Sequence, residues 1–447
     1  MVRFTYQLLW LSYRLRRWGL RQFTPSGLAL LVALAVAGLI GLDIKQSVSY
    51  QVFALLFALL LVAIAASRFI RYRLSATRNL PRFGTVGVPL QYRIGVHNVT
   101  RKRLRGLRIQ DEIAATFPPY AAFAKTVKEK NPIRRRRAWL RVLARNQWAV
   151  VRSTDLPVLA AKQTTEVTVE LVPLHRGVLP LASIVFTCPD PLGFVNRCFS
   201  LYLPQSLLVL PQRYQLPPME MPGMRRHQAG ALALASSVGD SEEFRALREY
   251  RPGDSPRKIH WKSWAKLGKP VIKEEQAEYA VRHGLILDTF QTEDHSEALE
   301  AAVAIAASFA CTLQTSGQSQ ECLLDTVFAG ATENCFTVGR GVGQTERLLE
   351  WLASIKACQN QPFKALRPTV QTKLGQLSGC ICIFLDWDRD RQQLVELLQV
   401  AKIPTLILVV AGENGLSEVP DRSCLQERQS RLHVLPIDGI QEALLQL

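Results

Sequence analysis

Residues 379–410 read GCICIFLDWDRDRQQLVELLQVAKIPTLILVV. The stretch begins and ends with apolar runs of the length of buried strands, at 379–386 and 405–410. Between them, 389–400 repeats leucine and valine at helical spacing, with charged residues on the other side. A strand, a helix and a strand in this order predict a βαβ unit whose two strands are parallel.

The same alternation continues on both sides of this unit. Further strands are predicted at 283–289, 321–328 and 431–436, and further helices at 295–313, 345–357 and from 440 onward. We therefore expect residues 216–447 to contain a mostly parallel, doubly wound α/β domain. Its functional loops would lie at the carboxyl ends of the strands.

The preceding region, residues 81–215, has a different period. Apolar and polar residues alternate in 90–96, 165–171 and 181–186, with turn residues between these segments. Period-two alternation predicts an antiparallel sheet with one buried face, here a small domain resembling a β-sandwich.

Residues 1–80 contain two uncharged apolar runs, GLALLVALAVAGLIGL at 27–42 and VFALLFALLLVAIAA at 52–66. A pair of soluble helices would show polar faces, and a signal peptide would be followed by a cleavage site instead of a second apolar run. We predict a transmembrane helical hairpin with spans at about 25–42 and 50–67.

Arginines flank this hairpin on one side of the membrane. Five precede the first run and five follow the second between 68 and 82, whereas the connecting loop has only Asp43 and Lys45. The positive-inside rule predicts a multi-pass protein of the cytoplasmic (inner) membrane with both termini in the cytoplasm. Trp10, Tyr13 and Trp18 among the first arginines are typical of an interfacial segment on anionic lipid.

The net charge of +18 is unevenly distributed. Residues 1–150 hold 26 Lys and Arg against 4 Asp and Glu, a net of +22, so the remaining 297 residues carry a net of −4. Beyond the membrane flanks, the excess is concentrated in a basic insertion at 125–145, where 134–137 are four consecutive arginines. The insertion suits a solvated loop or contact with the lipid bilayer; a nucleic-acid surface is a further alternative, and we expect no nucleic-acid partner.

An unusual segment at 240–274 precedes the α/β domain. Asp240 and Glu243 form a possible capping box, 251–254 reads Arg-Pro-Gly-Asp as a turn, and 260–266 reads HWKSWAK, an aromatic and basic cluster. This segment resembles the signature of the bacterial family called "domain of unknown function fifty-eight", Leu-Arg-x-Tyr-x-Pro-Gly-Asp-x-x-Arg-x-Ile-x-Trp. The matching residues are Leu247, Arg248, Tyr250, Pro252, Gly253, Asp254, Arg257, Ile259 and Trp261.

Other parts of the chain also fit members of this family: the Arg176-Gly177 turn, the 190–194 motif DPLGF and the N-terminal two-span anchor. The resemblance implies a C-terminal domain similar to von Willebrand factor A and association with a MoxR-type AAA+ ATPase. It implies no established enzymatic activity. The signature residues, together with His260 and Lys262, then form a predicted interaction surface.

Domains similar to von Willebrand factor A can hold a metal on an Asp-x-Ser-x-Ser loop after the first strand. Here 288–292 reads DTFQT, so Asp288 and Thr292 match in kind and Phe290 replaces the first serine. Asp386 and Asp388, after a later strand, could supply the remote carboxylate. Because one oxygen ligand is missing, we expect no cofactor, with Mg²⁺ at this degenerate site as the alternative.

The motifs of common hydrolases and nucleotide sites, Gly-x-Ser-x-Gly, His-Glu-x-x-His and the P-loop, do not occur in the sequence. We therefore expect a non-enzymatic, membrane-anchored cytoplasmic scaffold or adaptor that works with a MoxR-type AAA+ ATPase in complex assembly or envelope maintenance. One alternative is a phosphate- or metal-dependent enzyme centred on 251–266, with Asp254 and His260 as acid and base. The other is a membrane-tethered nucleic-acid binder.

Overall fold

The fold was analysed in a computed structural model. It describes residues 2–40, 47–69, 73–101, 103–114, 117–127, 131–217, 246–251, 259–274, 281–293, 295–315, 322–328, 342–359, 361–412, 416 and 430–447. The chain divides into two compact units, Met1–Leu210 and Pro211–Leu447. The first unit thus combines the two N-terminal regions that the sequence separated at residue 80.

Three helices open the first unit: α1 (Val2–Gln22), α2 (Pro25–Ile40) and α3 (Ser47–Phe69). Within α3, the segment Val48–Arg68 is long and apolar enough to cross a membrane, with a mean hydropathy of 2.4. Only 11% of its most apolar 18 residues are buried by the rest of the protein. The apolar helix α2 is shorter than a full span. The two helices pack against each other around Leu30, Leu60 and Ala63.

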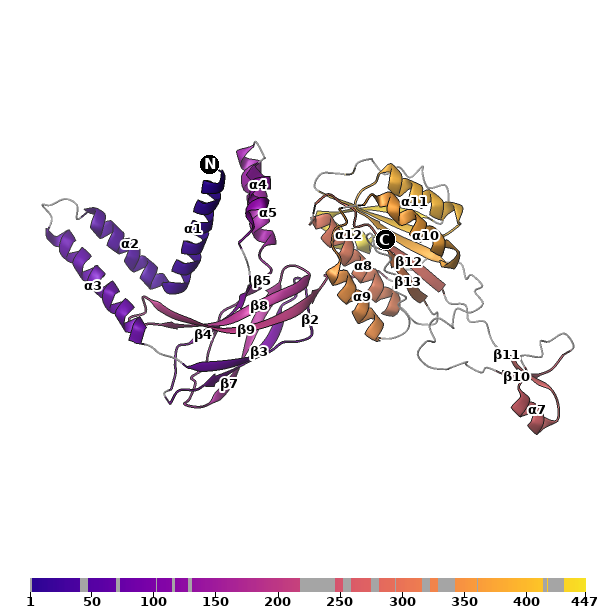
Figure 1. The fold of residues 1–447 in the computed structure, drawn as a ribbon, viewed down its shortest axis with the longest axis horizontal. Helices are drawn as coiled ribbons and strands as arrows, with labels where there is room; N and C mark the ends of the chain where they lie inside the picture. The colour runs from indigo at the N-terminus through magenta and orange to yellow at the C-terminus, as the bar shows by residue number, and fades with distance from the viewer. Residues whose placement is uncertain are drawn as a thin grey trace. The chain divides into compact units, whose positions relative to one another are not determined.

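Two sheets follow these helices, as the period-two segments predicted (Figure 1). The first has the order β1-β3-β7-β5, and all of its pairs are antiparallel. The second has the order β2-β9-β8-β4-β6, in which only β2 runs parallel to its neighbour β9. The strands are β1 (Leu74–Asn79), β2 (Phe83–Thr85), β3 (Leu90–Asn98), β4 (Arg108–Ile113), β5 (Ala149–Val151), β6 (Thr154–Asp155), β7 (Thr164–Pro173), β8 (Gly177–Pro189) and β9 (Asn196–Leu210).

Residues of both sheets share one apolar core. Alternate residues of β3, namely Tyr92, Ile94 and Val96, are buried in it together with Ile184 and Phe186 of β8. The alternation arises because successive side chains of a strand point to opposite faces of the sheet. The sandwich-like middle domain was therefore predictable from the pattern alone.

The basic insertion folds as two helices, α4 (Tyr120–Val127) and α5 (Pro132–Arg145). The side chain of Asn131 caps α5 by accepting a hydrogen bond from Ile133 N at 3.0 Å. Trp139 of α5 packs edge-on against Phe117 and Phe123, with ring centroids 5.8 and 5.1 Å away. The helix thus has an aromatic face toward α4, while Arg135, Arg136 and Arg137 are exposed.

The second unit contains the predicted parallel sheet, in the order β13-β12-β14-β15-β16. The strands are β12 (Val281–Leu287), β13 (Cys322–Phe328), β14 (Gly379–Phe384), β15 (Thr405–Ala411) and β16 (Arg431–Pro436), and every pair is parallel. The helices are α8 (Glu297–Thr315), α9 (Val342–Ser354), α10 (Arg367–Lys373), α11 (Arg389–Val400) and α12 (Ile440–Leu445), with 3₁₀ turns at Phe363–Leu366, Leu374–Gln376 and Ile437–Gly439.

Helices cover both faces of this sheet (Figure 1). Every residue of β14 is buried, which explains the absence of polar alternation in that run. Cys380 and Cys382 lie on one face of β14, within the core that includes Leu394 of α11. In chain order the strands run 2-1-3-4-5, so the order reverses between β12 and β14, at the position where doubly wound folds usually bind ligands.

Candidate functional site

A small hairpin carries the described part of the signature, and we call residues 246–251 and 259–274 the signature hairpin. Its strands β10 (Ala246–Glu249) and β11 (Val271–Glu274) are antiparallel. Tyr250 N donates to Pro270 O at 3.0 Å, and His260 N donates to Val271 O at 2.8 Å. The second bond ties the start of the helix α7 (Trp261–Leu267) to β11.

The helix α7 presents aromatic and basic side chains to solvent. Trp261 is 64% exposed and stacks on Trp264, with ring centroids 5.2 Å apart and an interplanar angle of 18°. Lys262 and Lys266 are also exposed, and no residue of the helix is buried. Gly268 ends the helix in the left-handed region, at φ 67°, and its N–H bonds Trp264 O. The hairpin thus displays an exposed tryptophan, stacked on a half-buried one, on a helix that also exposes two lysines.

The signature residues fall on this hairpin as follows. Leu247 and Arg248 lie on β10, Tyr250 follows it, Ile259 bridges to Ile272, and His260, Trp261 and Lys262 lie at the start of α7. Four others, Pro252, Gly253, Asp254 and Arg257, are outside the described residues, as are Asp240 and Glu243 of the predicted capping box. The imidazole Nδ1 of His260 is hydrogen-bonded to Ser263 Oγ at 2.7 Å.

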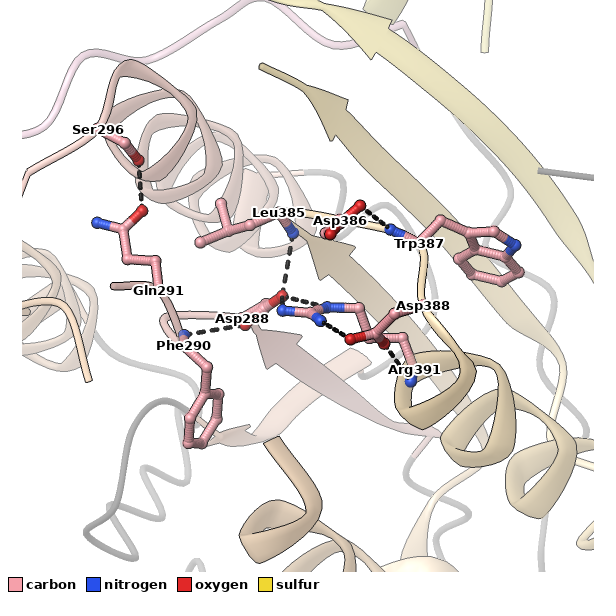
Figure 2. A network of polar contacts seen from close by, with 9 residues as sticks. All are labelled: Asp288, Phe290, Gln291, Ser296, Leu385, Asp386, Trp387, Asp388 and Arg391. Atoms are coloured by element: carbon pink, nitrogen blue, oxygen red, sulfur yellow. Dashed lines mark hydrogen bonds and ion pairs between the residues drawn. The ribbon is translucent and has the colours of Figure 1, made fainter. Parts of the chain in front are cut away.

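The second candidate site lies at the carboxyl ends of β12 and β14 and is drawn in Figure 2. Asp288 follows β12 and is fully buried. Its Oδ1 accepts from Phe290 N at 3.0 Å, and its Oδ2 accepts from Leu385 N at 3.1 Å and from Arg391 Nε at 2.7 Å. Arg391 Nη2 lies 2.6 Å from the same Oδ2. Both carboxylate oxygens are therefore satisfied by the protein.

Arg391 reaches this position from the first turn of α11. Asp388 caps that helix by accepting from Arg391 N at 3.0 Å, and its other oxygen accepts from Arg391 Nη1 at 2.6 Å. The guanidinium also lies over the ring of Phe363, 4.7 Å from its centroid. One cation is thus held between two carboxylates and an aromatic face.

The charges of this cluster favour the ionised guanidinium. Burial alone would lower the pKa of Arg391, but the carboxylates of Asp288 and Asp388 outweigh burial and raise that pKa above its usual value. We call Asp288, Asp388, Arg391 and Phe363 the Arg391 cluster.

The residues around Asp288 do not fit a magnesium ion. Thr292 is exposed, and Asp386 Oδ1 accepts from its neighbour Trp387 N at 2.7 Å. Thr289 Oγ1 is the one buried side-chain oxygen of the described loop that has no hydrogen-bond partner. The described residues contain no group of three or more His, Cys, Asp or Glu side chains arranged to hold a metal. Arg391 instead supplies the positive charge beside Asp288.

Sequence reasoning missed Arg391, although a signal for it exists. Its spacing from Leu394, Val395 and Leu398 is three, four and seven residues, which places it on the buried face of α11. A charged residue on an otherwise apolar helix face needs a buried partner. The nearby Asp386 and Asp388 were visible candidates, whereas the decisive partner, Asp288, is 103 residues away in sequence.

Residues 246–379 match the family model described as "Protein of unknown function DUF58". The matched segment begins at β10, includes Asp288 and ends at the first residue of β14, before Asp388 and Arg391. It confirms the resemblance of the signature segment to this family. The match carries no information about a domain similar to von Willebrand factor A or about an ATPase partner.

The "Uncharacterized protein YeaD" of Bacillus subtilis (strain 168) is 24% identical over 196 residues, which cover 43% of this chain and 46% of that protein. The chain thus spans about half the length of this relative. Among solved structures, the CARDB domain of PF1109 from Pyrococcus furiosus in complex with di-metal ions is 13% identical, covers 31% of this chain and 89% of its own, and has a TM-score of 0.18. A Salmonella alpha-2-macroglobulin mutant is 16% identical, covers 35% and 8%, and also has a TM-score of 0.18. Scores this low carry no argument about the fold.

Proposed function

We propose that this chain is a non-enzymatic, membrane-anchored scaffold or adaptor whose cytoplasmic α/β unit binds a protein partner through the signature hairpin. The supporting observation is the 64% exposed Trp261, stacked on the half-buried Trp264, on a helix that also exposes Lys262 and Lys266. Tryptophan and cationic side chains are frequent anchors of protein interfaces, and their preformed stack lowers the entropy lost on binding.

The proposed partner is a MoxR-type AAA+ ATPase, and the proposed process is complex assembly or envelope maintenance. This part rests on the family resemblance of the signature and not on a contact in the structure. We further propose that the α/β unit is similar to von Willebrand factor A. The five parallel strands with helices on both faces support this assignment, and the Arg391 cluster distinguishes it from a metal-binding member.

We propose two membrane spans, α2 and α3, with both termini in the cytoplasm of an inner membrane. The length and hydropathy of α3 and its packing against the uncharged helix α2 support the hairpin. The arginines on both flanks support its orientation. Few residues of the apolar part of α3 are buried by the protein, as expected for a helix surrounded by lipid.

The interaction is tested with the full chain in lipid nanodiscs and a purified MoxR-type ATPase from the same organism, measured by biolayer interferometry. The variant Trp261→Ala/Trp264→Ala should weaken binding at least tenfold. Val400→Ala is the matched control, because Val400 is an apolar residue of the same unit that is 85% exposed.

Equal binding by wild type and the double tryptophan variant would remove the hairpin from the interface. No binding by wild type would contradict the ATPase partner. Nucleic acid retained by the purified full chain, with retention falling steeply as salt increases, would favour the nucleic-acid alternative.

A further inference from the structure

One face of α1 is bound to the rest of the first unit. The Tyr6 hydroxyl donates to Pro118 O at 2.9 Å, and its ring packs on those of Tyr120 and Phe123 at 5.4 and 5.5 Å. Two turns further on, Tyr13 packs on Phe117, with ring centroids 5.2 Å apart. Through these rings α1 joins α4 and, by way of Trp139, α5.

Ion pairs hold the second half of the same face. Arg17 and Arg21 donate to Glu112 Oε1 at 3.1 and 2.8 Å, and Ser183 donates to Glu112 Oε2 at 3.0 Å. Burial would raise the pKa of Glu112, but the bonds and charges of Arg21, Ser183 and Arg17 lower it overall. The carboxylate of β4 is thus kept ionised toward α1.

The opposite face of α1 is apolar and uncovered. Its large exposed side chains recur with spacings of four, three, four and three residues, which keep them on a single side of a helix. We call these residues the α1 stripe: Phe4 (64% exposed), Leu8 (51%), Leu11 (46%), Leu15 (56%) and Trp18 (56%). The other side of the helix carries Tyr6, Tyr13 and Arg17, which are seven and four residues apart.

A tight joint fixes where α1 meets the first apolar helix. Thr24 Oγ1 and Ser26 Oγ donate to Gly193 O at 2.5 and 2.7 Å. A Cβ added to Gly27 would lie 2.0 Å from Phe194 O, so the start of α2 is pressed onto this turn. Because α2 begins there, the joint places the carboxyl end of α1 beside the start of α2. A bilayer spanned by α2 would therefore have its surface next to this end of α1.

Exposed cations accompany the α1 stripe. Arg14 and Arg16 flank it on α1, and Arg135, Arg136 and Arg137 are exposed on α5 in the same unit. Anionic headgroups neutralise such charges at a membrane surface, whereas a second copy of the same face would bring like charges together. Charge and continuity with α2 therefore favour lipid over self-association.

We propose that the α1 stripe lies in the interfacial layer of an anionic leaflet, with α1 parallel to the membrane and Arg14, Arg16 and the exposed arginines of α5 on the headgroups. The chain then contacts the bilayer in two ways, through the apolar helices and through a surface helix. The β-domain, bound to α1 on its other face, is held at a fixed orientation to the membrane by both contacts. The inference goes beyond the proposed adaptor function and does not depend on it.

The test uses the full chain, one copy per nanodisc, in phosphatidylcholine with 30% phosphatidylglycerol (about a physiological anionic fraction). Leu11→Cys and Ser12→Cys are labelled with a membrane-impermeant maleimide, and labelling of each cysteine is followed by peptide mass spectrometry, which separates it from the native thiols. Ser12 is exposed and adjacent but off the α1 stripe, which makes it the matched control. Both positions are exposed, so neither change should prevent folding.

Lipid coverage predicts labelling at least tenfold slower at position 11 than at position 12 in this nanodisc. Equal rates would overturn the proposal, and slow labelling that appears only when two copies share a nanodisc would assign the α1 stripe to self-association instead. In pure phosphatidylcholine, labelling at position 11 should become several-fold faster. An unchanged rate there would disprove the anionic part of the proposal.

Discussion

Each unit contains a buried Arg–Asp ion pair, and the two pairs lie at different kinds of position in their sheets. Arg78 on β1 and Asp111 on β4 have fully buried side chains and connect the two sheets of the β-domain. Arg391 and Asp288 are nearly as buried, at 7% and 0% exposed, but lie where the carboxyl ends of parallel strands meet. Burial alone therefore does not separate a structural ion pair from one at a potential ligand site; the position in the sheet does.

The Arg78 pair is satisfied entirely by the core. Arg78 Nε donates to Asp111 Oδ2 at 2.9 Å, Nη1 donates to Leu203 O at 2.8 Å, and Tyr92 donates its hydroxyl to Asp111. Burial and the Asp111 charge raise the pKa of Tyr92, so the phenol remains a donor. This network joins β1 of one sheet to β4 of the other inside the core.

The Arg391 cluster occupies a position that many doubly wound folds leave open. Its guanidinium connects the loop after β12 with the first turn of α11, so it stabilises the switch point instead of opening it. The Arg391 guanidinium, a cation supplied by the chain, occupies the position beside Asp288. This interpretation leads to predictions about each pair.

The largest effect is expected from Asp111→Ala. It leaves Arg78 buried without its counter-charge and removes the acceptor of Tyr92, which should destabilise the first unit by about 3–5 kcal/mol. Urea unfolding of the full chain in detergent measures the change. Asp155→Ala is the control, because the Asp155–Arg108 pair is 78% and 64% exposed and its loss should change stability by less than about 1 kcal/mol. Similar losses for both variants would contradict a special role for burial.

A somewhat smaller effect is expected from Arg391→Ala, which leaves Asp288 buried and uncompensated and should cost about 3 kcal/mol. The same change vacates the cationic position, so Mg²⁺ should raise the melting temperature of the variant by several degrees and leave that of wild type unchanged. Calorimetric titration and thermal unfolding with and without Mg²⁺ measure this. Heat of Mg²⁺ binding in wild type, abolished by Asp288→Ala, would instead support a metal site.

Acid should weaken the second unit through His283, a buried residue of β12 whose burial lowers its pKa from 6.5 to about 4. The unfolded chain binds a proton below pH 6.5 and the folded chain does not. Stability is therefore complete above pH 6.5 and decreases as the pH falls to 4, by at most about 3 kcal/mol. His283→Leu should remove this component in denaturant titrations at pH 7, 5.5 and 4.5. Parallel pH curves for variant and wild type would exclude His283 as the cause.

The smallest change in stability is expected from Trp261→Ala. Because Trp261 is 64% exposed and α7 buries none of its residues, the free energy of unfolding should change by about 0.5 kcal/mol or less. Urea unfolding measures it beside the partner-binding assay. A loss of more than about 2 kcal/mol would identify the tryptophan stack as structural and weaken its assignment as an interface.

Local patterns predicted much of the fold. Unbroken apolar runs indicated β14 and β15, and period-two alternation indicated β3 and β7, because each pattern reports burial on two faces or one. The helices of the basic insertion were not predicted, although Asn131-Pro132 is a common helix start. The most conspicuous feature of this segment is its charge. The helix α5 is instead stabilised by the packing of Trp139 on Phe117 and Phe123, which lie outside the segment.

The candidate sites were only partly accessible from the sequence. The signature identified the residues of the hairpin, and Trp261 and Lys262 are exposed as an interaction surface requires. The metal alternative named Asp288 and Asp386 but not Arg391, since nothing local links position 288 to position 391. In the same way, two arginines of α1 expected near lipid, Arg17 and Arg21, are instead paired with Glu112.

The sequence by itself determined many of the strands, the longer helices of the second unit, the apolar runs and where the charge is concentrated, because these depend on periodicity and composition within short windows. Only the tertiary structure decided which charges meet: Arg78 with Asp111, Arg391 with Asp288, and Arg21 with Glu112. It also decided that β2 runs parallel to β9. Such pairs join residues far apart in the chain, and their energy comes from burial created only when the elements pack.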